Sequence, residues 1–105
     1  MTRTTAVLLS MTLFAVATQP AWAAADIEHG QTLAERWCAS CHVVAPGQQH
    51  GSTQAPPFSE VAKEPGLDAG KLALFLLLPH PRMPDMNLSR NEAADLAAYI
   101  LTQGK

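Results

Sequence analysis

Residues 38–42 of this chain read Cys38-Ala39-Ser40-Cys41-His42, and this short segment decides how the rest of the sequence is interpreted. It is a C-x-x-C-H motif, the pattern at which a c-type haem is attached. Two thiols three residues apart lie on one side of a helical turn, where they can add to the two vinyl groups of one porphyrin. The next residue then places an imidazole under the iron. The chain has 2 cysteines, and both are in this motif, so we expect one covalently bound haem c.

A pair of close cysteines has two other common uses. Trp37 followed by Cys38 and Cys41 also matches a thioredoxin-type dithiol, but that motif follows a strand and opens a helix, whereas the residues before Cys38 have helical spacing. A structural zinc site needs four ligands, and the sequence holds no second C-x-x-C motif to complete one. Both alternatives fit the sequence less well than haem does.

The first 23 residues have the pattern of a cleavable secretory signal peptide. Arg3 provides the positive start, residues 6–17 form an uncharged apolar stretch, and Ala21 and Ala23 provide the small residues of a cleavage site. We expect cleavage after Ala23 and export to the periplasm. The alternative is a retained membrane anchor, although the apolar stretch is shorter than the roughly 20 residues that span a bilayer.

Residues 24–105 are then expected to form a single small domain that carries the haem. A domain of this size has a marginal core unless a cofactor or a crosslink adds to it. The chain has 7 Lys and Arg residues against 9 Asp and Glu, and removal of Arg3 leaves 6 against 9. The domain is therefore mildly acidic. Its sequence contains no cluster of basic residues that would indicate nucleic-acid binding. We expect a monomer with no membrane span in this part of the chain.

Apolar residues recur at helical spacing along this domain, and no segment alternates as a strand does. The spacing predicts a helix over residues 26–41, a short helical turn over residues 58–63, and a helix over residues 69–78 with Asp68 as its N-cap. Residues 46–57 are rich in Gly, Pro and Gln and are expected to form an irregular loop. The predicted fold class is all-α.

The last predicted helix has the clearest boundaries. Ser89 and Glu92 have the S-x-x-E spacing of a capping box, and Leu88 precedes them as a hydrophobic staple. An apolar stripe follows, and Gly104 lies where a helix of this length would stop. We therefore expect a C-terminal helix that begins at Ser89 and packs one face on the core.

The far side of the haem iron needs a second axial ligand unless it stays open. After residue 23 the chain has two methionines, Met83 and Met86, and His50 and His80 are further candidates. Met83 is preferred because residues 79–84 are rich in proline, which stiffens the segment and holds a side chain out from it. A thioether ligand also suits electron transfer, because it stabilises ferrous iron. Met86, either histidine or an open site remain the alternatives.

Together these features resemble those of the class I cytochromes c. The resemblance rests on the motif at residues 38–42, on Met83 followed by Pro84, and on a final helix that carries Leu96 and Tyr99. It covers essentially all of residues 24–105 and is closest to the short bacterial periplasmic monohaem proteins of the c551/c552 type. It implies three to four short helices wrapped around one covalently attached haem.

The resemblance also implies roles for single residues. Gly30 stands where the family has the glycine at which the first and last helices cross, and Tyr99 matches the aromatic residue that packs over this crossing. The carbonyl of Pro56 is expected to accept the N–H of the proximal ligand His42, and Phe58 is expected to lie against the porphyrin. His42 and Met83 would then be the two iron ligands.

The chain departs from the family pattern in one place. Ala34 stands where many members have a bulky aromatic residue, and we expect Trp37 to fill the space instead. The residues that bind the haem propionates are left open. Arg36, Lys71 and Arg82 are candidates because Lys and Arg form charge-assisted bonds with carboxylates. Polar side chains of the loop could help by hydrogen bonding, namely Gln48, Gln49, Ser52 or Thr53.

The expected function is to carry single electrons between redox proteins that dock only briefly. The sequence shows no other constellation of catalytic residues, so we do not expect an enzyme. Two alternatives stay open: a haem subunit that works inside a larger oxidoreductase complex, and a haem enzyme or sensor that binds a small molecule at a labile distal site.

Overall fold

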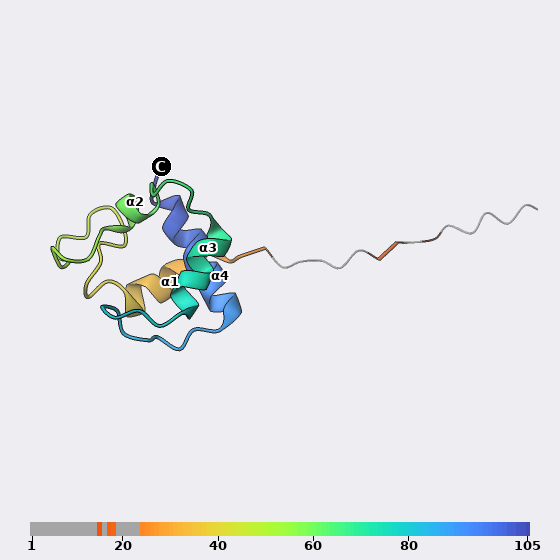
Figure 1. The fold of residues 1–105 in the computed structure, drawn as a ribbon. Coiled ribbons are helices and arrows are strands. Elements are labelled where there is room, and N and C mark those ends of the chain that lie inside the picture. The colour runs from red at the N-terminus through yellow and green to blue at the C-terminus, as the bar shows by residue number, and fades with distance from the viewer. Residues whose placement is uncertain (1–14, 16, 19–23) are drawn as a thin grey trace, which may run out of the picture.

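A computed structural model describes residue 15, residues 17–18 and residues 24–105. Most of the predicted signal peptide, with its cleavage site at Ala23, lies outside the described residues. The described part of the chain contains four helices and no strand (Figure 1): α1 (Ile27–Trp37), α2 (Phe58–Val61), α3 (Ala69–Leu77) and α4 (Arg90–Thr102). The predicted all-α fold with three to four short helices is confirmed. Among the described residues, no helix is both long enough and apolar enough to cross a membrane.

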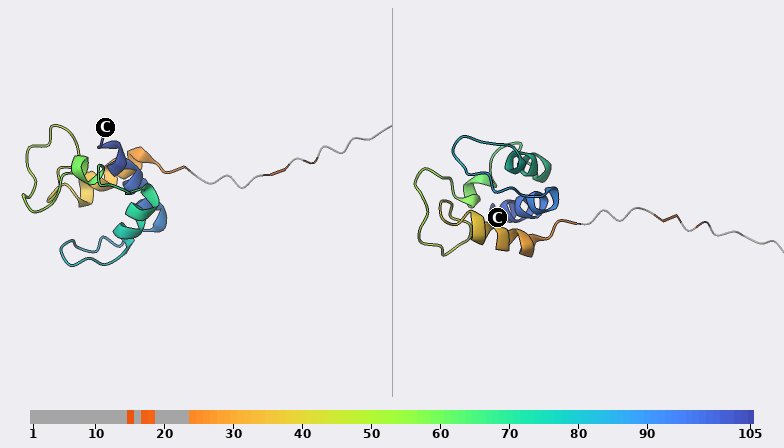
Figure 2. Two further views of the ribbon diagram at one scale, coloured as in Figure 1. Left: turned by 45° about the horizontal axis from the view of Figure 1, so that its top comes forward. Right: turned by 90° about the horizontal axis from the view of Figure 1, so that it is seen from below.

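The C-terminal helix α4 is the centre of the arrangement. It contacts α1, α2 and α3, and no other pair of these four helices is in contact. The view from below in Figure 2 shows α4 lying between α1 on one side and α3 on the other. Two long loops, residues 38–57 after α1 and residues 78–89 after α3, extend from this helical frame (Figure 1). The position of each loop therefore depends on how its helix packs on α4.

Helix α1 crosses α4 at Gly30, where the two backbones approach closely. A Cβ atom built on Gly30 would lie 2.7 Å from the carbonyl carbon of Asp95 and 2.8 Å from the Cβ of Tyr99. Separations under about 3 Å do not occur between real side chains, so only glycine fits here without a shift of one helix. The crossing at Gly30 that the family resemblance implied is present, with Tyr99 beside it.

The helices begin at residues whose side chains satisfy free backbone N–H groups. Asp26 and Asp68 cap α1 and α3 by accepting the N–H of the residue three positions later. At α4 the predicted capping box is present: Ser89 Oγ accepts the Glu92 N–H at 3.1 Å, and the Glu92 carboxylate accepts the Ser89 N–H at 2.7 Å. Leu88 is partly buried against the core, as a hydrophobic staple would be.

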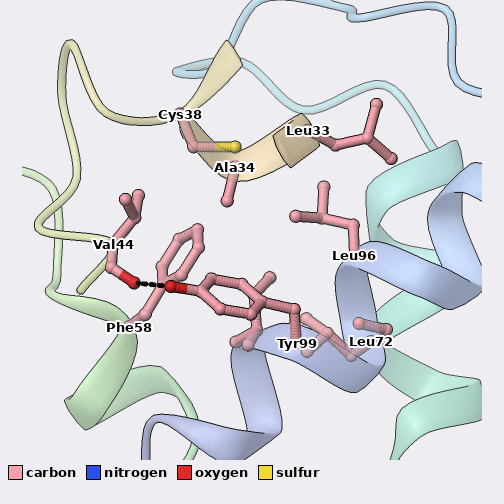
Figure 3. Close-up of a cluster of buried hydrophobic side chains, with 10 residues drawn as sticks. Leu33, Ala34, Cys38, Val44, Phe58, Leu72, Leu96 and Tyr99 are labelled. Atoms are coloured by element: carbon pink, nitrogen blue, oxygen red, sulfur yellow. Dashed lines mark hydrogen bonds between the residues drawn. The ribbon is translucent and has the colours of Figure 1, made fainter. Parts of the chain in front are cut away.

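The buried core joins the helices to the loop that follows the cysteine motif (Figure 3). The Tyr99 hydroxyl on α4 donates to the Val44 carbonyl at 2.7 Å, and both residues are buried. This bond gives the buried polar groups their partners and fixes the loop after the motif to α4. The buried apolar residues of the core are Leu33, Ala34, Cys38, Val44, Phe58, Leu72, Ala93, Leu96, Ala97, Tyr99 and Ile100.

The first helix ends earlier than predicted, at Trp37 rather than at Cys41. The Ala34 carbonyl accepts the N–H groups of both Cys38 and Ala39, at 2.9 and 3.1 Å, so the helical register is lost there. The chain then continues in a tighter turn, in which the Cys38 carbonyl accepts from both Cys41 and His42. The cysteine motif therefore forms its own hydrogen-bonded turn at the end of α1.

The expected place of Trp37 in the core is wrong. Trp37 is 46% exposed, and the Arg36 guanidinium lies 5.2 Å from its ring centre as a cation–π pair. Ala34 is fully buried, so the position next to the crossing is filled by a small side chain and Trp37 does not replace the missing aromatic residue. Trp37 is the last residue of α1, where its ring stays exposed.

Other helix ends also differ in detail from the prediction. Helix α2 ends at Val61, two residues before the predicted end at residue 63. Helix α3 stops at Leu77, one residue early, because Leu78 precedes Pro79 and takes an extended conformation with ψ 145°. Helix α4 ends close to Gly104 as expected, but Gly104 is not in the left-handed conformation of a glycine cap. A Cβ atom there would lie 2.9 Å from the Cβ of Ala62, so this glycine allows the end of α4 to pack against the residue after α2.

The close crossing leads to a stability prediction for the haem-loaded protein. Replacement of Gly30 with alanine should lower the free energy of unfolding by about 1–3 kcal/mol, because the added methyl group forces α1 away from α4. Gly70→Ala is the matched control. The nearest contact of the added methyl group would be Oδ1 of Asp68, the N-cap of the same helix, at 3.4 Å. This change should therefore be neutral or stabilising by up to about 1 kcal/mol. Guanidinium unfolding measures both values, and equal effects of the two variants would contradict the packing argument.

A second prediction concerns the ion pair that ties α1 to α4. His29 Nδ1 lies 2.8 Å from Asp95 Oδ2, and Asp95 also accepts the Asp26 N–H at 2.7 Å. The hydrogen bond with Asp95 raises the pKa of His29 above 6.5, with further support from the charges of Asp26 and Glu92. Burial raises the pKa of Asp95, but the hydrogen bonds from His29 and Asp26 outweigh it, so the net pKa lies below 3.8.

The direction of the pH dependence follows from these two shifts. The histidine contribution to stability is present below pH 6.5 and is lost as the pH rises through the raised pKa, whereas the Asp95 contribution is lost as the pH falls below 3.8. The destabilisation caused by His29→Gln should therefore be largest between these values and shrink above pH 6.5. In an Asp95→Asn background the same substitution should show no such dependence. An equal effect of His29→Gln at all pH values in both backgrounds would refute the ion pair.

Candidate haem site

A cavity of about 670 Å³ opens beside the cysteine motif. It lies within the range of volumes that small-molecule and cofactor sites have in proteins. Its walls come from the motif, from the loop before α2, from α2 and α3, from the segment after α3, and from Ile100 of α4. Most of the lining side chains are apolar. The predicted site residues that line it are Cys38, His42, Pro56, Phe58 and Met83.

The two cysteines have different surroundings. Cys38 is buried and lines the cavity, whereas Cys41 is exposed at the end of the turn. Burial raises the pKa of the Cys38 thiol to about 11, so as a free thiol it would remain protonated at neutral pH. Because the thiolate is the reactive form in dithiol exchange, this environment does not suit a thioredoxin-type function. It does suit a sulfur atom that is bonded to a group filling the cavity.

His42 is oriented by a hydrogen bond to the backbone. Its Nδ1 lies 2.7 Å from the carbonyl oxygen of Pro56. A carbonyl oxygen can only accept, so Nδ1 carries the proton and Nε2 of the neutral ring keeps a free lone pair. A metal-binding histidine commonly uses its second nitrogen in this way, which sets the tautomer and the ring orientation. The Phe58 ring, 5.4 Å from the imidazole centre and tilted by 45°, packs beside it.

Sequence reasoning missed the residue that holds this loop together. Gln48 was considered only as a possible propionate partner, but it does not line the cavity and its side-chain amide is used by the backbone. Its Oε1 accepts the Val44 N–H at 2.9 Å, and its Nε2, which has two N–H bonds to donate, lies 3.1, 2.7 and 2.8 Å from the carbonyl oxygens of Ala39, His42 and His50. Gln48 therefore bridges the motif to the following loop. No local pattern marks such a role, because all its partners are backbone atoms fixed by the fold.

The candidates for the second axial position are separated clearly. Met83 lines the cavity, and so does His80. Met86 instead packs against the hydrophobic core, and His50 is exposed in the loop after the motif. His29 is held by Asp95 at the crossing of α1 and α4. The segment of residues 79–84 thus brings one thioether and one imidazole to the wall of the cavity.

The basic candidates for the propionates are also separated by the fold. Arg82 lines the cavity, whereas Arg36 stacks on Trp37 and does not reach it. Lys71 donates to the Gly66 carbonyl at 2.9 Å and lies 3.9 Å from the carboxylate of Asp68. Of these three candidates, Arg82 is the one that lines the cavity.

The residues around the cavity fit a haem and do not fit a structural zinc ion. Within the described residues, no three His, Cys, Asp or Glu side chains lie close enough together to hold a metal ion by themselves. A porphyrin requires a wide apolar slot, a thiol and an imidazole at one wall, and a further ligand at another wall. Cys38, His42 and Met83 meet these requirements on the lining of one cavity.

Comparison with known proteins agrees with this geometry. A family model described as Cytochrome c matches residues 27–104. A protein of Bradyrhizobium diazoefficiens named cytochrome c-552 is 60% identical over 77 residues, which cover 73% of this chain and 74% of that protein. No solved structure gives a significant match.

These findings confirm the family, the fold class and the cofactor that the sequence predicted. The motif at Cys38, Cys41 and His42 fits the covalent attachment of haem c in this family. The expectation that the protein is not an enzyme is also supported, since cytochromes of this kind transfer electrons. The chain belongs to the cytochrome c family and is an electron carrier with a covalently bound haem c.

Proposed function

We propose that this protein carries single electrons in the periplasm and that His42 and Met83 are the two axial ligands of its haem iron. The observation that carries the proposal is the placement of both residues on the lining of one cavity, together with the buried thiol of Cys38. The haem supplies the redox couple, since its iron alternates between the ferric and ferrous states. The chain binds the haem, orients it and limits the access of water to it.

The proximal side is prepared by the bond between His42 and Pro56. With Nδ1 directed to the Pro56 carbonyl at 2.7 Å, the lone pair of Nε2 is available to a metal. The bond also makes the imidazole a stronger base and so a better ligand. Phe58 lies beside this ring and also packs edge-on against Tyr99, with 6.4 Å between the ring centres. The proximal wall of the cavity is therefore connected to α4.

The distal side depends on the segment that carries Met83. This segment has prolines at positions 79, 81 and 84, which restrict its backbone, and it follows directly on α3. Phe75 and Leu76 of α3 line the same cavity. Thioether ligation in apolar surroundings favours ferrous iron and raises the reduction potential, which suits a carrier.

The remaining parts of the proposal concern location and partners. The signal-peptide pattern of residues 1–23 supports export to the periplasm, where the mature protein would be residues 24–105. We expect a monomer that meets its redox partners in brief encounters through a small interface. A permanent place in a larger complex would instead appear as co-purification with a catalytic subunit.

Visible spectroscopy of the haem-loaded protein tests the axial ligands. The oxidised wild-type protein should show the weak far-red band of a thioether bound to iron, and the reduced protein should not bind carbon monoxide at neutral pH. Met83→Ala should abolish the band and lower the potential by a sizeable part of the roughly 0.8 V that axial ligands control. Met86→Ala is the matched control and should keep the band. A band that survives Met83→Ala would refute this ligand.

The mass of the exported protein tests the signal peptide. When the full chain is expressed in a bacterium that attaches haem c, the periplasmic protein should begin at Ala24. Ala21→Glu places a large charged residue in the cleavage site and should leave the longer, membrane-associated chain. If the intact mass of the unmodified protein still includes residues 1–23, the segment is a retained anchor.

A further inference from the structure

The segment after α3 contains a second side chain that is chemically able to bind the haem iron. His80 Nδ1 lies 2.7 Å from the carbonyl oxygen of Leu78. Because a carbonyl can only accept, Nδ1 of the neutral ring carries the proton and Nε2 keeps the lone pair. This Nε2 is buried and forms no hydrogen bond with any described residue. A buried polar atom without a partner is unusual in a folded protein and calls for an explanation.

The ring of His80 is held close to the haem cavity. It stacks on Phe75 of α3 with 4.3 Å between the ring centres and 21° between the planes. It lines the large cavity and also an adjoining cavity of about 180 Å³, and Met83 lines both of these as well. His80 and Met83 therefore share the same surroundings, on the same short segment of chain.

The two histidines that line the haem cavity have the same arrangement. His42 and His80 each direct Nδ1 to a backbone carbonyl at 2.7 Å, which leaves Nε2 free in both. The other two histidines do not resemble them, since His29 is paired with Asp95, and His50 is exposed and does not line the cavity. His80 thus has the same tautomer as the proposed iron ligand His42, although the proposed site gives it no bond to the iron.

A short movement of the segment would exchange His80 for Met83. The two residues are three positions apart, so their Cα atoms are separated by at most about 11 Å. The bond that fixes the His80 tautomer is to Leu78, only two residues away. This bond can move together with the segment, so the lone pair of Nε2 would stay available during the shift.

From this geometry we propose that His80 is a latent second ligand, which binds the haem iron through Nε2 when the thioether of Met83 leaves it. The inference rests on the proposed role of Met83. In the exchange an iron–sulfur bond breaks and an iron–nitrogen bond forms, with no change in protons or electrons. Imidazole stabilises ferrous iron less than a thioether does, so the exchange would lower the reduction potential and favour the oxidised protein.

Electron paramagnetic resonance and visible spectra of haem-loaded variants test the proposal. Oxidised Met83→Ala should lack the thioether band but remain low-spin, with the signature of two histidine ligands. Met83→Ala combined with His80→Gln should lose the low-spin signal, become high-spin, and bind carbon monoxide more readily when reduced. Met83→Ala combined with His50→Gln is the matched control and should stay low-spin.

A further variant distinguishes loss of the imidazole ligand from loss of the ring packing on Phe75. Met83→Ala combined with His80→Phe keeps an aromatic ring to stack on Phe75 but has no nitrogen, and it should also be high-spin. A high-spin Met83→Ala protein, or a low-spin signal that survives both changes at His80, would overturn the latent ligand. Failure of the proposed function gives a different result: if Met83 is not an iron ligand, the wild-type protein itself lacks the thioether band.

Discussion

The close contact between α1 and α4 at Gly30 is the constraint on which the rest of the structure depends. Helix α4 is the one helix that touches the other three, so each element is placed relative to it. Helix α1 leads directly into the cysteine motif, and its distance from α4 decides how far Cys38 and His42 lie from the opposite wall. A side chain at position 30 would separate the two backbones and displace that wall. Gly30 does not line the haem cavity itself, but it sets how closely α1, which leads into the cysteine motif, packs on α4.

Backbone carbonyls then decide which nitrogen of each cavity histidine is free. Pro56 holds Nδ1 of His42, and Leu78 holds Nδ1 of His80, both at 2.7 Å. Neither bond requires a particular side chain on the accepting residue, since the acceptor is a main-chain oxygen. The chemistry of the site is therefore set largely by the path of two loops, and Gln48 and Tyr99 hold the first of these loops in place.

Much of this arrangement could be predicted from local patterns in the sequence. The capping box at Ser89 and Glu92 marks the start of α4, and Pro79 locates the end of α3 to within one residue, because both signals act between near neighbours in the chain. The end of α1 was predicted four residues too late, because the Ala34 carbonyl accepts two N–H groups and ends the helix in a way no composition reveals. The expected burial of Trp37 was also wrong, since this last residue of α1 is exposed.

The sequence by itself determined the chemistry: the C-x-x-C-H motif holds the two thiols and the imidazole that attach haem c, and helical spacing with capping residues specifies an all-α chain. Only the tertiary structure decided which of the remaining residues meet at the cavity. It placed Met83, His80 and Arg82 on the wall and left Met86, His50 and Arg36 away from it. Local sequence favoured Met83 through the prolines around it, but it did not separate His80 from His50 or Arg82 from Arg36, because their positions depend on contacts between segments distant in the chain. Packing on α4 brings those segments together, and no nearest-neighbour pattern encodes it.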